Sequence, residues 1–198
     1  TIQTLNAANK IDPGSTRTTA SEWAIMSGFA RVSYNYESRY LISANMRADG
    51  SSRLAPGHRW AYFPSVSAAW RISGEPWMEE VEWIDDLKIR GGWGQTGNQG
   101  GIGDYAYLER YSINRQNWWE TGKEHAVPTF SQSSLRNTDL TWERTTQTNV
   151  GLDWTMLKNR LTLNFDWYYK YTTDMLMWVS LPAGSAAVSS IQRNEGEM

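Results

Sequence analysis

The stretch "NVGLDWTMLKNRLTLNFDWYYKYT" (residues 149–172) alternates apolar and polar residues on both sides of a short turn. Its apolar positions are Val150, Leu152, Trp154, Leu163, Phe165 and Trp167. Because successive side chains of a strand point to opposite faces of a sheet, the stretch predicts an antiparallel hairpin with one apolar and one polar face, Tyr168 being the exception on the polar side. Alternation alone does not decide whether the apolar face meets a protein core or lipid.

The same alternation recurs upstream. "FARVSYNYESRYLISANMRADG" (29–50) predicts a second hairpin, and "FPSVSAAWRIS" (63–73) places Val66 and Trp70 opposite Ser65, Ser67 and Arg71. "GEPWMEEVEWIDD" (74–86) predicts a short helical turn that begins at Pro76. The strands that we predict lie at about 23–36, 40–49, 60–72, 87–97, 140–154 and 160–172. Long loops are expected at 98–139 and 173–198, and residues 1–22 are expected to be a loop or a preceding extracellular segment.

Composition excludes several classes of protein. The net charge of -2 gives no reason to expect nucleic acid, and the absence of Cys removes thiolate catalysis and disulfides. With a mean hydropathy of -0.60, no run approaches the roughly 20 apolar residues of a membrane-spanning helix. The chain has 12 Trp and 10 Tyr beside 4 Phe, an excess typical of a membrane interface or a sugar-binding face.

Connections alternate between short and long, as in outer-membrane barrels, which have short periplasmic turns and long extracellular loops. About ten residues at ~3.3 Å each, tilted by ~45°, rise roughly 23 Å, close to the apolar band of such barrels. We therefore predict an all-β fold of antiparallel up-and-down strands, about six of which form part of a large transmembrane β-barrel (23–198).

Arg144 on the apolar series is expected at or above the outer interface, since an arginine at the midplane would cost roughly 2–4 kcal/mol. The alternative is a soluble β-sandwich, such as a carbohydrate-binding module with a dry core.

Enzyme chemistry has little support in the sequence. "GQTGNQGGIGD" (94–104) lacks the Gly-Lys-Ser/Thr of a phosphate loop, and His58 and His125 are single histidines in loops. The carboxylates between Glu79 and Asp86 are expected to form a solvated surface. We predict no catalytic residues, no cofactor and no metal.

The loop at 98–139 holds the best binding candidates, because aromatic faces beside planar hydrogen-bonding groups suit the apolar faces and hydroxyls of sugars. These candidates are Tyr105, Tyr107, Tyr111, Arg115, Trp118 and Trp119. The alternative is that they pack the loop against neighbouring loops or a lid protein.

From about Gly28 onward the chain resembles the barrel region of the SusC/RagA class of TonB-dependent outer-membrane transporters of Bacteroidetes. The motifs that carry the resemblance are, in order, "YNYESRYLISANMRADGSSR", "FPSVSAAWRISGEPWM", "LKIRGGWGQTGNQ", "LTWERTTQTNVGLDW", "NRLTLNFDWYYKYTTDML" and "NEGEM". Gly91 and Gly92 depart from it, since the family more often has a small pair such as Ala-Ser there.

The resemblance implies a barrel of about 22 strands in the bacterial outer membrane, filled by a plug domain and paired with a SusD-like surface lipoprotein. It implies import of oligosaccharides or peptides with energy relayed by TonB, and a passive porin is the alternative. Plug and TonB-interacting segment are absent from this chain, so we expect it to be a fragment. The residues expected to face outer-membrane lipid are Val66, Trp70, Val150, Leu152, Trp154, Leu163, Phe165 and Trp167.

Overall fold

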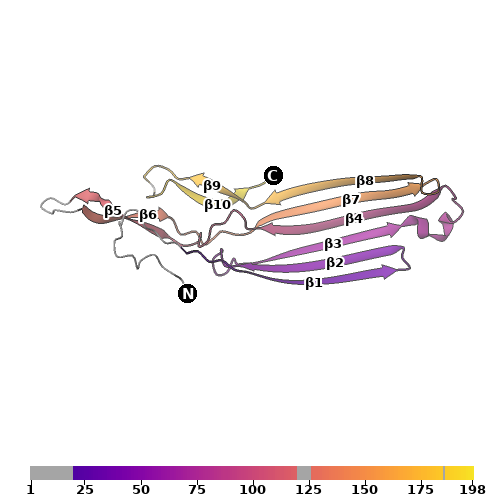
Figure 1. Cartoon of the computed structure of the whole chain (residues 1–198), viewed down its shortest axis with the longest axis horizontal. Coiled ribbons are helices and arrows are strands. Elements are labelled where there is room, and N and C mark those ends of the chain that lie inside the picture. The colour runs from indigo at the N-terminus through magenta and orange to yellow at the C-terminus, as the bar shows by residue number, and fades with distance from the viewer. Residues whose placement is uncertain (1–19, 120–125, 185) are drawn as a thin grey trace, which may run out of the picture.

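The computed structural model describes residues 20–119, 126–184 and 186–198, and its main feature is one sheet of six long strands (Figure 1). These strands are β1 (Ile25–Tyr36), β2 (Tyr40–Ser51), β3 (Trp60–Arg71), β4 (Ile84–Asn98), β7 (Glu143–Met156) and β8 (Leu161–Thr173). They lie in the order β1-β2-β3-β4-β7-β8, and every neighbouring pair is antiparallel. The all-β, up-and-down prediction is confirmed. No helix in the described ranges is long and apolar enough to cross a membrane.

Short connections gather at one end of the sheet and long ones at the other, as Figure 1 shows. At the short-turn end, β3 and β4 are joined through two 3₁₀ turns, η2 (Ile72–Gly74) and η3 (Pro76–Met78), rather than one helical turn. Pro76 begins η3, as predicted, because its missing N–H is not needed at the first helical position. The alternation of loop lengths expected from the sequence is therefore present.

The turn between β1 and β2 is closed by a hydrogen bond from Arg39 N to Tyr36 O (3.0 Å), and both central residues have positive φ, 49° at Glu37 and 57° at Ser38. Such a type I′ turn matches the right-handed twist of the strands, but it holds two side chains in the left-handed region. The Asn35 Oδ1 atom stabilises it by accepting the Ser38 N–H at 3.0 Å.

Replacing Ser38 with glycine is expected to stabilise the protein by about 0.5–1 kcal/mol, because glycine removes part of the roughly 1–2 kcal/mol steric cost of a left-handed residue. Thermal unfolding of the full-length protein in detergent measures the gain. Ser33→Gly, within β1, is the control and should destabilise. Equal behaviour of the two variants would contradict this account of the turn.

Register divides the sheet into two faces, defined here as the apolar face and the polar face. Cα pairing places Ile42, Ala68, Gly91, Val150 and Trp167 in one row of the apolar face. The neighbouring row on the polar face is Ser43, Ser67, Gly92, Asn149 and Tyr168. The faces predicted from period-two alternation are therefore continuous across all the strands, with Tyr168 on the polar face.

Two small sheets lie within the segments 98–139 and 173–198, for which the sequence predicts long loops. β5 (Arg110–Trp119) pairs with β6 (Ala126–Ser134), and β9 (Met175–Ser180) pairs with β10 (Ser190–Gly196). In Figure 1 both lie at the long-loop end, and β5–β6 projects well past the six-stranded sheet. Their alternation is shorter and interrupted by register shifts, which explains why the sequence did not reveal them.

The buried core of the described residues is small and lies at the long-loop end. It consists of Leu54, Ala61, Phe63, Ile102, Leu140 and Trp142. Since Ala61 and Phe63 belong to the polar face of β3, the loops that pack on them fold over that face. Leu140 and Trp142 turn into this core, which accounts for β7 beginning at Glu143 rather than at 140.

Large side chains of the apolar face remain uncovered. Val150 is 46% exposed, Phe165 65% and Trp167 52%, and no second sheet of the described chain packs on them. A β-sandwich would bury such residues in a dry core. The sandwich alternative is therefore wrong for this chain.

Candidate functional site

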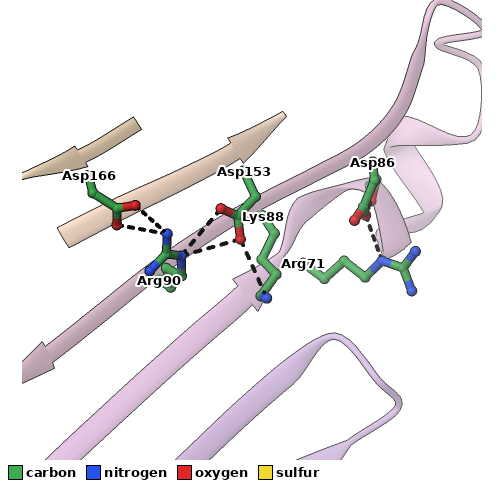
Figure 2. Close-up of polar contacts among 7 residues, drawn as sticks. Arg71, Asp86, Lys88, Arg90, Asp153 and Asp166 are labelled. Carbon is green, nitrogen blue, oxygen red and sulfur yellow. Dashed lines mark hydrogen bonds and ion pairs between the residues drawn. The ribbon is translucent and has the colours of Figure 1, made fainter. Parts of the chain in front are cut away.

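Ion pairs cross the polar face near the short-turn end and form what we call the charged ladder (Figure 2). Arg71 Nε lies 2.7 Å from Asp86 Oδ1, and Lys88 Nζ lies 3.6 Å from Asp153 Oδ2. Arg90 contacts Asp153 at 3.3 Å and Asp166 at 2.7 Å. The ladder thus connects β3, β4, β7 and β8, and its charges are balanced.

The one ion pair of the charged ladder that spans an intervening strand, Arg90–Asp166, depends on a glycine. Arg90 on β4 reaches Asp166 on β8 across the intervening strand, where Gly151 is the residue between them in register. A Cβ added at Gly151 would lie 2.7 Å from both Arg90 Cζ and Asp166 Oδ1. The absence of a side chain therefore lets the guanidinium cross β7.

We expect Gly151→Ala to destabilise the full-length protein by about 1–3 kcal/mol, because the new methyl group displaces the Arg90–Asp166 pair. Gly91→Ala is the matched control, since its Cβ would meet nothing closer than Asn149 O at 3.8 Å. Denaturant unfolding in detergent compares the two. Similar losses of stability at both positions would show that Gly151 does not act by leaving room for the Arg90–Asp166 ion pair.

Beside the charged ladder, toward the long-loop end, the middle strands of the polar face carry serines and amides that are hydrogen-bonded across strands. Ser43 Oγ and Ser67 Oγ lie 2.8 Å apart, and Asn45 Nδ2 donates to Ser65 Oγ at 3.1 Å. At Gly92 an added Cβ would lie 2.7 Å from Asn149 Oδ1, so the amide of Asn149 occupies the space that a side chain at position 92 would need.

Glu75 is a buried carboxylate that the sequence pattern does not single out. It is 7% exposed and accepts hydrogen bonds from Tyr40 Oη (2.6 Å), Trp70 Nε1 (3.0 Å) and Arg39 Nη1 (3.1 Å). These bonds, that of Tyr40 first and that of Trp70 second, lower the pKa of the Glu75 carboxyl below its usual value. The donors come from two separate stretches of chain, Arg39–Tyr40 and Trp70, so no local sequence pattern predicts the site.

Two aromatic pairs lie at the short-turn end, and the rings of one of them, Tyr40 and Trp70, bond Glu75. Tyr40 and Trp70 stack with their centroids 6.4 Å apart and their planes at 8°, and Trp83 meets Trp154 edge-on at 5.9 Å. Glu79, Glu80 and Glu82 are exposed as expected, but Asp85 accepts the Asn159 N–H at 2.9 Å and Asp86 belongs to the charged ladder. The carboxylate run is thus only partly a solvated surface.

Of the six predicted loop residues, the three whose side chains the structure describes, Tyr105, Tyr107 and Tyr111, are not brought together. Tyr105 lines a hollow of about 720 Å³ at the long-loop end, with Asp104, Arg110, Asn137 and Trp178 among its other lining residues. Tyr107 lies in a second hollow beside Pro56 and Arg136, and Tyr111 lies on β5. Arg115, Trp118 and Trp119 are also on β5, but their side chains lie outside the described part of the molecule. His125 lies outside the described residues too.

Asp104 connects the segments around the larger hollow. It accepts hydrogen bonds from Arg53 Nε (2.8 Å) and from Ser21 Oγ, and the Arg53 guanidinium lies 4.5 Å from the Trp23 ring centroid. The bond from Ser21 and the Arg53 cation lower the pKa of Asp104. Within the described ranges, no three His, Asp or Glu side chains could hold a metal ion.

Comparison with known proteins agrees with this geometry. A family model described as "TonB dependent receptor-like, beta-barrel" matches residues 1–198. The chain belongs to this family. It is 36% identical over 179 residues to TonB-dependent receptor SusC of Bacteroides thetaiotaomicron, covering 90% of this chain and 18% of SusC. It is 36% identical over 197 residues to TonB-dependent receptor P39 of Formosa agariphila, covering 100% of this chain and 18% of P39.

Solved structures give the same result. The RagAB peptide importer in its "open-open" state matches with a TM-score of 0.76 and 32% identity, over 88% of this chain and 18% of that one. The "closed-closed" state matches with a TM-score of 0.75 and 31% identity, over the same shares. The chain is therefore a segment of a TonB-dependent receptor barrel, similar to SusC and RagA, and it spans about a fifth of these relatives' length.

Proposed function

We propose that the chain forms part of the outer-membrane wall of a TonB-dependent importer for glycans or peptides. The observation that carries the proposal is the pairing of an exposed apolar face with an ion-paired polar face in one sheet. In this arrangement the apolar face meets lipid and the polar face meets the barrel interior, the reverse of a soluble protein. All eight residues expected to face lipid, from Val66 to Trp167, lie on the apolar face.

The chemistry of the wall is that of passage rather than catalysis. The charges of the charged ladder are paired with one another, and hydroxyls and amides beside it bond across strands, so this part of the interior side offers hydration without a strong fixed site. RagAB is a peptide importer by its description, which supports a nutrient of that kind or an oligosaccharide. Energy from TonB would enter through parts of the protein outside this chain.

The experiment is uptake by the full-length protein as the sole copy in its host. Labelled peptides and labelled oligosaccharides are supplied in separate arms, with and without functional TonB. We expect uptake in one arm, abolished by loss of TonB. Uptake that persists without TonB would favour the passive porin, and uptake in neither arm would contradict import of these substrates.

We also propose a SusD-like surface lipoprotein as partner, meeting the long-loop end. One face of the β5–β6 hairpin supports this, because Tyr111, Ile113 and Phe130 lie on it and are 61%, 53% and 71% exposed. The opposite face carries Ser112 and Ser131, whose hydroxyls lie 2.9 Å apart. Aromatic groups of this kind are enriched at protein interfaces.

Alanine at Tyr111 and Phe130 is expected to reduce co-purification of the lipoprotein at least roughly tenfold, as loss of interface aromatics commonly does. Alanine at Ser112 and Ser131 is the control on the other face. If both pairs of substitutions leave co-purification unchanged, the hairpin is not the contact.

A further inference from the structure

One cation lies on the apolar face. Within the six long strands that the structure describes, Arg144 is the only charged side chain in the rows of that face. It lies on β7, in register with Gly97 of β4 and Thr173 of β8, and it is exposed. Because both neighbouring strands belong to the described chain, Arg144 is not at an edge of the sheet.

Arg144 has no hydrogen-bond or ion-pair partner among the described residues. The carboxylates close to it along the chain and across β8 bond other donors. Its chain neighbour Glu143 accepts Asn98 Nδ2 at 2.7 Å, and Glu197, beside β8, accepts the Tyr171 hydroxyl. The guanidinium therefore keeps all its donors for a partner outside the chain.

Uncharged polar residues accompany Arg144 at the long-loop end of the apolar face. We call this group the Arg144 patch, and its other members are Gln95, Thr146, Thr148 and Thr173. Gln95 Nε2 donates to Thr146 Oγ1 at 3.3 Å. On β1, β2 and β3 the same end of the face instead carries apolar and aromatic residues, among them Met26, Ala48, Trp60 and Tyr62. The change to polar side chains is thus confined to the strands around one cation.

The depth of the Arg144 patch matches the level of lipid headgroups. About ten residues of β7 separate Arg144 from Trp154, which meets Trp83 at the short-turn end. At ~3.3 Å each and a tilt of ~45°, they rise roughly 23 Å, close to the ~25 Å apolar band of outer-membrane barrels. With Trp154 at one membrane interface, Arg144 lies at the other, on the long-loop side, where a lipid-facing arginine costs least.

We propose that the Arg144 patch binds the phosphate group of a phosphorylated glycolipid in the outer leaflet of the membrane. The inference rests on the proposed function, since it takes the apolar face as the lipid-facing side. A guanidinium presents its N–H donors in a planar fork that matches two phosphate oxygens, and basic side chains at a membrane surface attract anionic headgroups.

The surroundings of Arg144 suit a whole lipid rather than an isolated anion. The hydroxyl of Thr173, next to Arg144 in register, can donate to a further phosphate oxygen. Farther down the same face, Val150 and Trp167 are exposed and apolar, so acyl chains attached to the headgroup continue over them. Headgroup and chains would therefore contact one continuous surface of β7 and β8.

Retention of glycolipid by the purified full-length protein tests the proposal. The wild-type protein, Arg144→Gln and Arg31→Gln are extracted in mild detergent, and mass spectrometry of the intact complexes counts bound glycolipid. Arg31→Gln is the matched control, because Arg31 is an exposed arginine on the polar face. We expect Arg144→Gln to retain roughly tenfold less glycolipid, as loss of a charge-assisted contact predicts, and the control to match the wild type. Equal retention by all three proteins would overturn the proposal.

Adding lipid back to the delipidated wild-type protein keeps the test independent of the variants. Separate samples receive the phosphorylated glycolipid, the same glycolipid after phosphatase treatment, or inorganic phosphate, and thermal unfolding is measured. We expect a raised unfolding temperature with the phosphorylated glycolipid alone. Equal protection by the phosphatase-treated lipid, protection by inorganic phosphate, or no protection would each contradict the proposal. Uptake and membrane assembly of the unmodified protein are measured in parallel, so failure of the proposed function is seen separately from failure of lipid binding.

Discussion

Replacing Trp167 with arginine is expected to prevent the full-length protein from assembling in the outer membrane, whereas arginine at the next residue, Tyr168, is expected to leave assembly intact. Both residues are aromatic and lie in the middle of β8. Trp167 is 52% exposed and Tyr168 is 69% exposed. They differ in face, since Trp167 lies opposite Val150 on the apolar face and Tyr168 lies opposite Asn149 on the polar face. A lipid-facing arginine at the bilayer midplane costs roughly 2–4 kcal/mol, and the same side chain in the interior keeps its water.

Heat-modifiable migration of the membrane fraction measures assembly directly, because folded barrels migrate differently from unfolded ones. Val66→Arg and Ser67→Arg repeat the comparison on β3, with Val66 on the apolar face and Ser67 on the polar face. The lipid-facing assignment requires that both apolar-face variants fail and both polar-face variants assemble. Equal effects within each pair would contradict it, as would recovery of these strands as a soluble, cooperatively folding monomer.

The sequence predicts the wall well because period-two alternation is a local property. Residues 160–172 determine their own faces, and register then follows from short turns such as 37–39, so a polar or apolar position on one strand implies the face of its neighbours. Arg144 follows the same logic. It lies in register with Gly97 and Thr173, at the long-loop end of the apolar face, and its position at or above the outer interface stays a prediction.

Features that depend on distant residues are not predictable in this way. Gly151 is important because Arg90 and Asp166, from two other strands, meet above it. Trp142 is a second example, because its Nε1 donates to Arg59 O at 3.0 Å inside the small core. The loop candidates are scattered for the same reason, because Tyr105 and Tyr107 are placed by contacts with other loops rather than by their own sequence.

Glu75 provides the second large expected effect. Replacing it with alanine removes the acceptor of Tyr40, Trp70 and Arg39 at once, so the half-buried donors at the short-turn end lose their partner. We expect a clear fall in unfolding temperature and in the yield of assembled protein, a smaller fall for Glu75→Gln, and no change for the exposed Glu79→Ala. Thermal unfolding in detergent ranks the three variants.

The dependence on pH follows from the lowered pKa of Glu75. Folding lowers this carboxyl's pKa below 4.5, so the ionised group stabilises the folded state at pH above about 4.5, and that stabilisation is lost as the pH falls from there through the folded-state pKa. As the pH falls through this window, the unfolding temperature of the wild-type protein should therefore decrease more steeply than that of Glu75→Gln, which has no carboxyl group to protonate at this position. Parallel pH curves for the two proteins would mean that the carboxylate is not the acceptor that holds Tyr40 and Trp70 in place, and that the stacked rings alone fix the short-turn end of the sheet.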